Sequence, residues 1–139
     1  MKFITTLFLF LSTISYSQIK SVQFNAVGNS TFSILRMENC VNDCKKITCI
    51  TLSIEIRIDE VEISEYDPEQ ILNVVGVVIF TDLTSKEKTT YTIKNIEDKN
   101  TLWYDDGSYS GRGLKLDVSK KLITTWEIGS YVQTKYFLK

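Results

Sequence analysis

Aliphatic and polar residues alternate along residues 50–59, and this pattern limits the possible folds more than any other feature of the chain. Every even position is aliphatic and every odd position is polar. Because successive side chains of a β-strand point to opposite faces, the pattern predicts a strand over residues 47–59 with one face on a core and the other in water. A helix would scatter these aliphatic residues around its circumference. The chain therefore has a β core.

Weaker alternation on both sides predicts that the whole domain is built from strands. One strand is expected over residues 19–27, ended by a turn at Gly28-Asn29, and another over residues 31–38, where both faces carry apolar residues. After the central strand, turn-forming residues separate further segments that favour strand. These are residues 77–82, 88–96, 101–105, 108–118, 122–128 and 131–137.

Asp106-Gly107 is typical of a two-residue hairpin turn. A type I′ turn needs positive φ at both central positions, which this pair tolerates. The turn would place Tyr104 opposite Tyr109 and Trp103 opposite Ser110.

Gly129-Ser130 suits a type II′ turn between the last two strands, because glycine at the first central position tolerates positive φ. The turn sets the pairing of the residues on either side. The expected pairs are Ile128 with Tyr131, Ile123 with Tyr136 and Leu122 with Phe137.

A short helix is expected over residues 68–74. Asp67 can cap it, Pro68 suits the first helical position, and Gln70 stands where a capping box reaches back. Gly76 and the β-branched residues around it favour strand and limit the helix to one or two turns.

About nine strands in mostly hairpin order, with one short helix near residues 68–74, predict an all-β domain. The antiparallel meander closes either into an up-and-down barrel or into a two-layer sandwich. The barrel form resembles the lipocalin-like class, although the chain lacks the Gly-x-Trp motif that this family carries near its mature N-terminus. The resemblance therefore implies architecture alone, with no family residues carried over.

The first residues are typical of a secretory signal peptide. Lys2 precedes a mostly apolar segment, and Ser15 and Ser17 are small residues before an expected cleavage between Ser17 and Gln18. The alternative is a membrane anchor, but the uncharged run over residues 3–19 is at the short limit for spanning a bilayer.

We therefore expect a signal peptide over residues 1–17 and one all-β domain over residues 18–139. The domain would be exported, either periplasmic or secreted, with no stable membrane anchor. The whole chain carries a net charge of −1, which gives no indication of nucleic-acid binding.

Three cysteines in an exported chain predict one disulfide and one spare thiol. We favour a Cys40–Cys49 bridge, and Cys40–Cys44 and Cys44–Cys49 are the other pairings that the spacing allows. A zinc site would need a fourth ligand, for which only Asp43 is near, so no metal is expected.

The Cys40–Cys49 bridge would also set the register of the two flanking strands. It would place Met37 opposite Leu52 and Leu35 opposite Ile54, which matches apolar residues on one face. The same register leaves two apolar residues on the other face. They are Phe32 and Ile34.

The absence of histidine excludes Ser-His-Asp and Cys-His catalysis and histidine metal ligation. Gly111-Arg112-Gly113 is too short and wrongly placed for a phosphate loop, and is more typical of a bulge or bend within a strand. Acidic pairs for glycoside hydrolysis stay open as an alternative, because such carboxylates come from distant positions, but no motif favours them. We therefore expect no catalytic residue, no enzymatic activity and no cofactor.

Residues 59–69 hold six acidic side chains and no basic one. Their spacing does not fit an EF-hand calcium loop. A dock for a basic partner is the other functional interpretation. We interpret the segment as a solvated acidic edge, which also keeps an edge strand from pairing with other chains.

Aromatic residues gather in the last three hairpins, and they are either core or a binding surface. Trp103 and Tyr104 point to opposite faces of one strand, so at least one of them lies outside the core or on a cavity. The candidate ligand-binding residues are Trp103, Tyr104, Tyr109 and Trp126.

Two functions follow from this pattern. The favoured one is a non-enzymatic binding module that takes a small apolar or sugar ligand in a barrel or on an aromatic face. The alternative is interaction with another envelope protein, as an inhibitor or assembly factor, through an edge strand or a loop. A hollow, aromatic-lined interior would favour the first, and a filled core with an exposed apolar patch the second.

Overall fold

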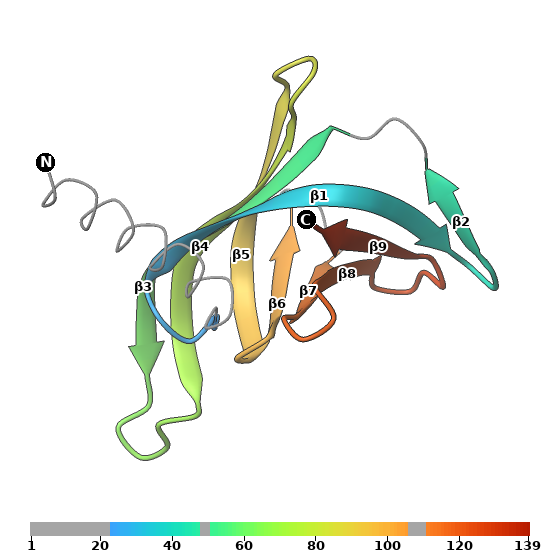
Figure 1. The fold of residues 1–139 in the computed structure, drawn as a ribbon. Helices are drawn as coiled ribbons and strands as arrows, with labels where there is room; N and C mark the ends of the chain where they lie inside the picture. Colours follow the sequence, from blue (N-terminus) through green and yellow to red (C-terminus); the bar gives the residue numbers. More distant parts are fainter. Residues whose placement is uncertain (1–22, 48–50, 106–110) are drawn as a thin grey trace, which may run out of the picture.

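The alternating residues form the middle of a long strand, β3 (Leu52–Ile63), in which Ile54, Ile56 and Ile58 are buried and Arg57 is exposed. The predicted half-buried strand is thus confirmed over its described part. The computed structural model describes residues 23–47, 51–105 and 111–139, and within these ranges all regular structure is β (Figure 1).

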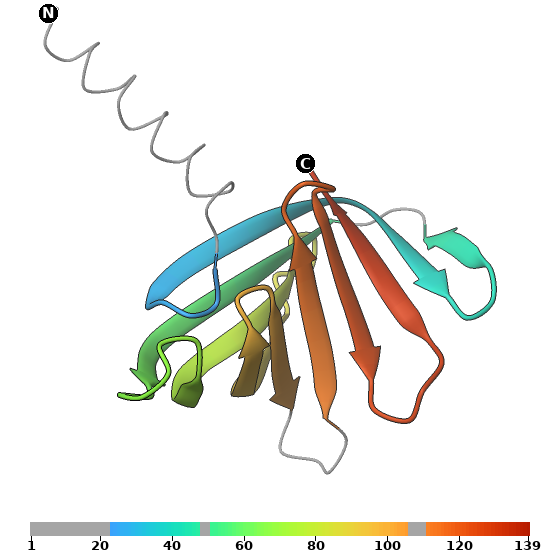
Figure 2. The same cartoon turned by 90° about the horizontal axis from the view of Figure 1, so that it is seen from below.

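The strands close into an antiparallel barrel. From β3 to β9 each strand pairs with the next, and β9 pairs back onto β1. Because β1 also pairs with β3, eight strands form the closed barrel and β2 is an extra strand on β1. Figure 2 shows β2 projecting from the far end of β1. Of the two predicted architectures, the barrel is confirmed. The other strands are β1 (Gly28–Cys40), β2 (Cys44–Ile47), β4 (Ile71–Asp82), β5 (Lys88–Asp98), β6 (Thr101–Asp105), β7 (Arg112–Asp117), β8 (Leu122–Glu127) and β9 (Gln133–Leu138).

A bulge in β1 explains why that strand carries apolar residues on both faces. Against β9 the register shifts between Ile34 and Arg36, so Leu35 is the extra residue and is 60% exposed. Before the bulge the even positions point into the barrel, and Phe32 and Ile34 are buried. After it the odd position Met37 turns inward. The bulge therefore changes which positions of one strand face the interior.

The register expected from a Cys40–Cys49 bridge is wrong. Ile54 lies opposite Phe32, not Leu35, and Met37 lies opposite Ile47 of β2. Phe32 and Ile34, which the expected register would have left on the other face, are both buried in the core.

The first predicted strand is wrong for residues 23–27, which form a turn before β1. Gly28 and Asn29 begin β1 instead of ending a strand. Phe24 is still buried: its backbone N–H donates to the Lys99 carbonyl at 2.8 Å, between β5 and β6, and its ring joins the core. Phe24 lies outside any strand, and its buried side chain covers this end of the barrel interior.

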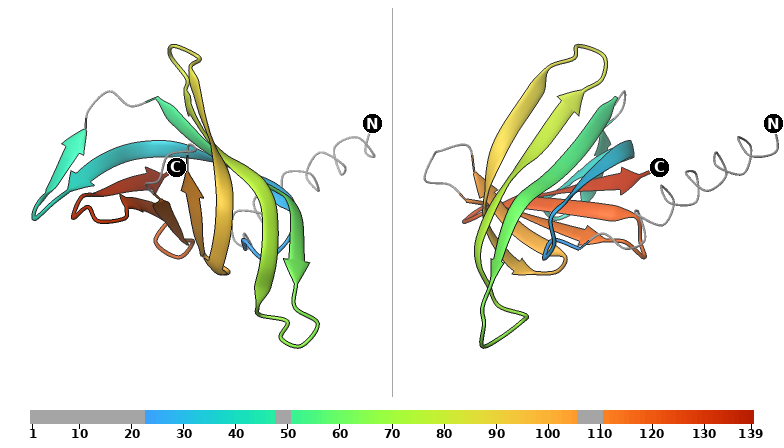
Figure 3. Two further views of the ribbon diagram at one scale, coloured as in Figure 1. Left: turned by 180° about the vertical axis from the view of Figure 1, so that it is seen from behind. Right: turned by 90° about the vertical axis from the view of Figure 1, so that its left-hand side faces the viewer.

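The predicted helix over residues 68–74 is also wrong. The Asp67 carboxylate accepts the Glu69 N–H at 3.0 Å and its carbonyl accepts the Gln70 N–H at 3.0 Å, which makes a turn at the tip of the β3–β4 hairpin. The chain then enters β4 at Ile71, because its β-branched residues extend a long ladder with β3. The acidic side chains of residues 59–69 are all exposed, as expected for a solvated edge. The hairpin projects beyond its neighbours (Figures 1 and 3).

The register predicted for the last hairpin is correct. The pairs Leu122 with Phe137 and Ile123 with Tyr136 are confirmed. Gly129, at φ +81°, is the third residue of a turn closed by the Ser130 N–H on the Glu127 carbonyl at 3.1 Å, which fits type II better than the expected type II′.

The Asp106-Gly107 hairpin register is wrong. Tyr104 lies opposite Arg112 and Trp103 opposite Gly113, so a two-residue connection cannot join β6 to β7. Asp106, Gly107, Tyr109 and Ser110 lie outside the described residues.

One half of the barrel is filled with aliphatic side chains. Ile54, Val78, Leu102, Leu114 and Ile123 are completely buried there. Gly76 of β4 permits close packing of β3, because a Cβ at this position would collide with the Arg57 carbonyl and crowd the Ile93 side chain. The filled half contains Phe24 and gives a continuous apolar core.

Candidate functional site

The other half of the barrel contains a pocket of about 630 Å³. Met37 of β1, Phe80 of β4, Thr89 of β5 and Glu127 of β8 line it, so its wall is built by strands from around the whole barrel. These residues stand at the strand ends farthest from Phe24, which lies by the β5–β6 connection. The pocket is therefore the mouth of the barrel.

Four aromatic rings form one wall of the pocket. The Phe80 ring centroid lies 5.6 Å from Tyr91, 6.3 Å from Tyr104 and 6.0 Å from Tyr136, and Tyr91 and Tyr104 are 5.1 Å apart. The Phe80–Tyr91 and Tyr91–Tyr104 pairs are edge-to-face, which is a favourable geometry for rings. Mutual packing holds each ring in place without a ligand.

Burial raises the pKa of the Tyr104 phenol, and burial likewise raises the pKa of Tyr136. Both groups are therefore neutral at physiological pH, and a neutral phenol carries a proton to donate. The Tyr136 hydroxyl also shares a hydrogen bond with the Thr125 side chain. The aromatic wall is thus a set of apolar faces with hydroxyl donors at their edges.

A pair of opposite charges stands in the same wall. Tyr104, Arg112 and Glu127 lie directly opposite one another on β6, β7 and β8. The Arg112 Nε donates to Glu127 Oε1 at 3.1 Å, and the guanidinium carbon lies 4.9 Å from the centre of the Tyr91 ring. At the border of the pocket the Arg112 cation therefore contacts the Glu127 carboxylate and the face of the Tyr91 ring.

Hydroxyl groups complete the lining. Thr125 and Thr134 lie opposite each other on β8 and β9, and both border the pocket. The Thr134 hydroxyl donates to the Asn39 Oδ1 at 3.1 Å, across to β1. With these groups the mouth can contact an apolar ring and hydrogen-bond to polar atoms of the same ligand.

The predicted ligand-binding residues do not form one cluster. Tyr104 lines the pocket and Trp126 borders it. The Trp103 and Trp126 rings contact each other edge-to-face, 5.6 Å apart, over Gly113, which lies opposite both residues. A Cβ at Gly113 would collide with the Trp126 ring. Trp103 therefore packs with Trp126 on the outer wall. It points away from Tyr104, as predicted for neighbours on one strand. Tyr109 lies outside the described residues.

Sequence reasoning missed Arg112, Tyr91, Phe80 and Tyr136 as site residues. A signal for Arg112 was present in the sequence. It is two and four residues from Leu114 and Leu116 on one strand, so it shares their face, and both leucines are buried inside the barrel. A charged residue on the inward face of a strand indicates a cavity or a buried partner.

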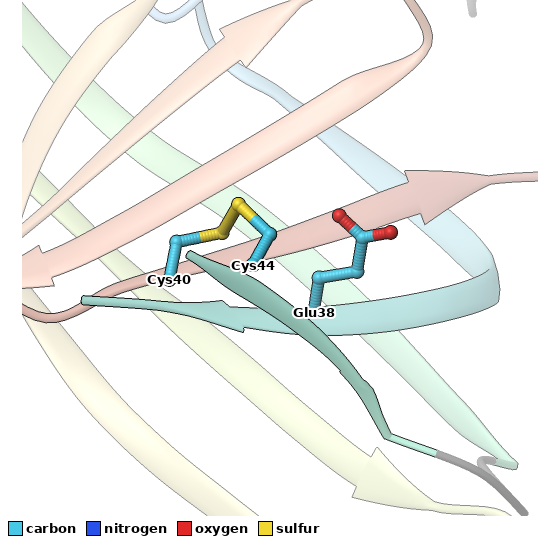
Figure 4. Close-up of side chains that lie close together, drawn as sticks. All are labelled: Glu38, Cys40 and Cys44. Carbon is cyan, nitrogen blue, oxygen red and sulfur yellow. A yellow bond between two sulfur atoms is a disulfide. The ribbon is translucent and has the colours of Figure 1, made fainter. Parts of the chain in front are cut away.

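The disulfide joins Cys40 to Cys44, not to Cys49 as we favoured from the sequence. The two Cα atoms are 4.0 Å apart on paired positions of β1 and β2, and this short hairpin brings the sulfur atoms together before the chain reaches residue 49. Figure 4 shows the Glu38 carboxylate beside the bridge. Both sulfur atoms are used by the disulfide, so the three residues form no thiolate metal site in this state. Cys49 lies outside the described residues.

Comparisons with protein-family models, with curated proteins and with solved structures return no significant match. The functional argument therefore rests on the fold and the pocket. Over residues 23–47, 51–105 and 111–139 there is no helix of the length and apolarity needed to span a bilayer.

Proposed function

We propose that this protein is a small binding module that holds a small molecule in the mouth of the barrel and does not act as an enzyme. The observation that supports this proposal is the hollow half of the barrel, whose volume of about 630 Å³ lies within the usual range of small-molecule sites. Its aromatic wall suits a ligand with a flat apolar part or a sugar ring. The absence of histidine argues against Ser-His-Asp and Cys-His mechanisms.

We further propose that the module works outside the cytoplasm, in the periplasm or as a secreted protein. The Cys40–Cys44 disulfide suits an oxidising compartment, and residues 1–17 carry the signal-peptide pattern. Intact mass of the exported protein should correspond to a chain that begins at Gln18. A mature chain that retains residues 3–17 would contradict this proposal.

Filling the pocket tests the binding function. Thr89 lies opposite Phe80 at the rim of the mouth, whereas its neighbour Thr90 lies opposite Ile79 and faces the outside of the barrel. Both threonines are exposed, so both sites accept a larger side chain. We expect Thr89→Trp to reduce the affinity for phenylnaphthylamine, a neutral aromatic probe, by at least about tenfold, since a large ring would occupy its space. Probe fluorescence during titration measures this affinity.

Thr90→Trp is the matched control, because it adds the same side chain one residue away on the outer face. It should leave the affinity for the probe unchanged. Equal affinity in both variants, or no binding by the unmodified protein, would refute the mouth as a ligand site.

Exposed apolar side chains on the β3–β4 hairpin favour the alternative function, interaction with another envelope protein. Tyr66 is 96% exposed, and Ile63, Leu72 and Val75 are also exposed on this projecting hairpin. Apolar side chains on a projecting edge are typical of protein contacts. A photo-crosslinking residue at position 66 should capture a specific envelope protein that one at position 90 does not, and equal labelling at both positions would argue against this role.

A further inference from the structure

Arg112 indicates which chemical class of ligand the pocket takes, and this inference rests on the proposed binding function. We propose that the ligand carries an anionic group, such as a carboxylate or sulfonate, and that Arg112 binds this group in competition with Glu127. The apolar part of the ligand would then lie against the aromatic wall.

The two members of the ion pair differ in burial, and this difference favours exchange of Glu127 for a ligand. The Arg112 side chain is 22% exposed and its Nη1 atom is fully buried, whereas the Glu127 side chain is 52% exposed. The Glu127 carboxylate is already half exposed, so it recovers full hydration when it turns into water, and its own release costs little. A buried guanidinium needs a compensating negative charge close by. A ligand anion can supply that charge in place of Glu127.

The remaining polar groups of the pocket favour an acceptor-rich ligand. Tyr104 and Tyr136 are neutral phenols that can donate, and the Ser130 and Thr89 hydroxyls also border the mouth. Among the charged lining residues, Glu127 accepts only and Arg112 donates only. An anionic oxygen can accept from several of these groups at once, and charge-assisted hydrogen bonds of this kind are among the stronger ones in proteins.

Arg36 has contacts similar to those of Arg112 but lies outside the pocket. The Arg36 guanidinium carbon lies 4.0 Å from the centre of the Phe137 ring, and its Nε is 3.8 Å from Glu38 Oε1. Arg36 thus has an aromatic face and a glutamate, as Arg112 has. Its side chain is 45% exposed and it does not line the pocket. Arg36→Gln is therefore a matched control for Arg112→Gln.

Two probes that differ by one group separate this inference from the proposed function. Anilinonaphthalene sulfonate and phenylnaphthylamine share the same rings, and only the first carries a sulfonate. We expect the unmodified protein to bind the sulfonate about tenfold more tightly than the neutral probe, which corresponds to one charge-assisted hydrogen bond. The readout is the ratio of the two affinities, measured by fluorescence titration.

Arg112→Gln should lower this ratio to about one, and Arg36→Gln should leave it at the value of the unmodified protein. Glu127→Gln should raise it, since the competing carboxylate is removed while the residue keeps its size. Glu127 is exposed, so this variant tests the inference even if Arg112→Gln fails to fold.

Binding of both probes with a ratio near one, or a ratio unchanged by Glu127→Gln, would overturn the anionic ligand and leave the proposed function intact. Binding of neither probe would refute the proposed function itself.

Discussion

The two halves of this barrel are built by the same strands but contain different side chains. In the half around Phe24 the inward positions are aliphatic and completely buried, as with Leu102 and Leu114. In the mouth the inward positions of the same strands are Tyr104 and Arg112, and a pocket remains. Strand alternation determines which positions face inward, but the type of residue along each strand determines whether the interior is filled or hollow.

The stability of the two halves should therefore come from different interactions. Apolar burial dominates the filled half. The mouth instead has edge-to-face ring contacts, the Arg112–Glu127 pair and the Thr134–Asn39 hydrogen bond. We expect a substitution in the filled half to cost more than a substitution of similar size in the mouth.

The largest effect is expected in the filled half. Leu114→Ala should lower the free energy of unfolding by about 2–5 kcal/mol, because a completely buried side chain is lost and a cavity remains. Thr89→Ala, in the mouth, is the comparison and should cost less than about 0.5 kcal/mol. Urea denaturation measures both, and similar losses in the two variants would remove the distinction between the halves.

A smaller effect is expected from the disulfide, which lies on the β1–β2 hairpin beyond Met37. Cys44→Ser should lower the free energy of unfolding by about 2 kcal/mol at most, since the Cys40–Cys44 ring is short. Thermal unfolding measures this loss. Thiol titration of the unmodified protein under denaturing, non-reducing conditions should count one free sulfhydryl per chain, from Cys49, and a count of three or zero would contradict the prediction.

The smallest effect near neutral pH is expected from the buried phenols of the mouth. Their folded-state pKa is raised above the ordinary value of 10.0, so the unfolded chain loses these protons first as the pH rises. The stability that they contribute is fully present below about pH 10 and is lost above it. Unfolding free energy measured from pH 7 to 11 should fall only at the alkaline end, and less steeply in Tyr104→Phe. An equal fall in both proteins would contradict burial of this phenol.

Local alternation was sufficient to predict the fold class, but features that depend on residues far apart in the sequence were not predictable. The strand around Ile54 and the Ile123–Tyr136 register depend on neighbours in sequence, and both predictions are correct. The Asp106-Gly107 register was wrong because a strong turn signal says nothing about where strand pairing resumes. The helix failed because a local cap at Asp67 was outweighed by a long ladder between β3 and β4.

The candidate site was only partly predictable for a similar reason. Tyr104 was identified because aromatic residues are conspicuous in a sequence. Arg112 was interpreted as part of a bend, since its inward direction becomes evident only when its parity with Leu114 is combined with barrel closure. The mouth is assembled from strands far apart in the chain, and a cavity of that kind has no contiguous sequence pattern.

The extra residue in β1 also determines how the pocket responds to changes in chain length. Leu35 shifts the strand so that Met37, rather than Arg36, points into the mouth. Loss of this one residue would leave a regular strand in which Ile34 points inward, Arg36 outward and Met37 inward, so the mouth would keep its apolar wall and residues 28–33 their pairing with β3. The bulge thus accommodates one residue that can be present or absent in related barrels without changing which side chains of β1 face the ligand.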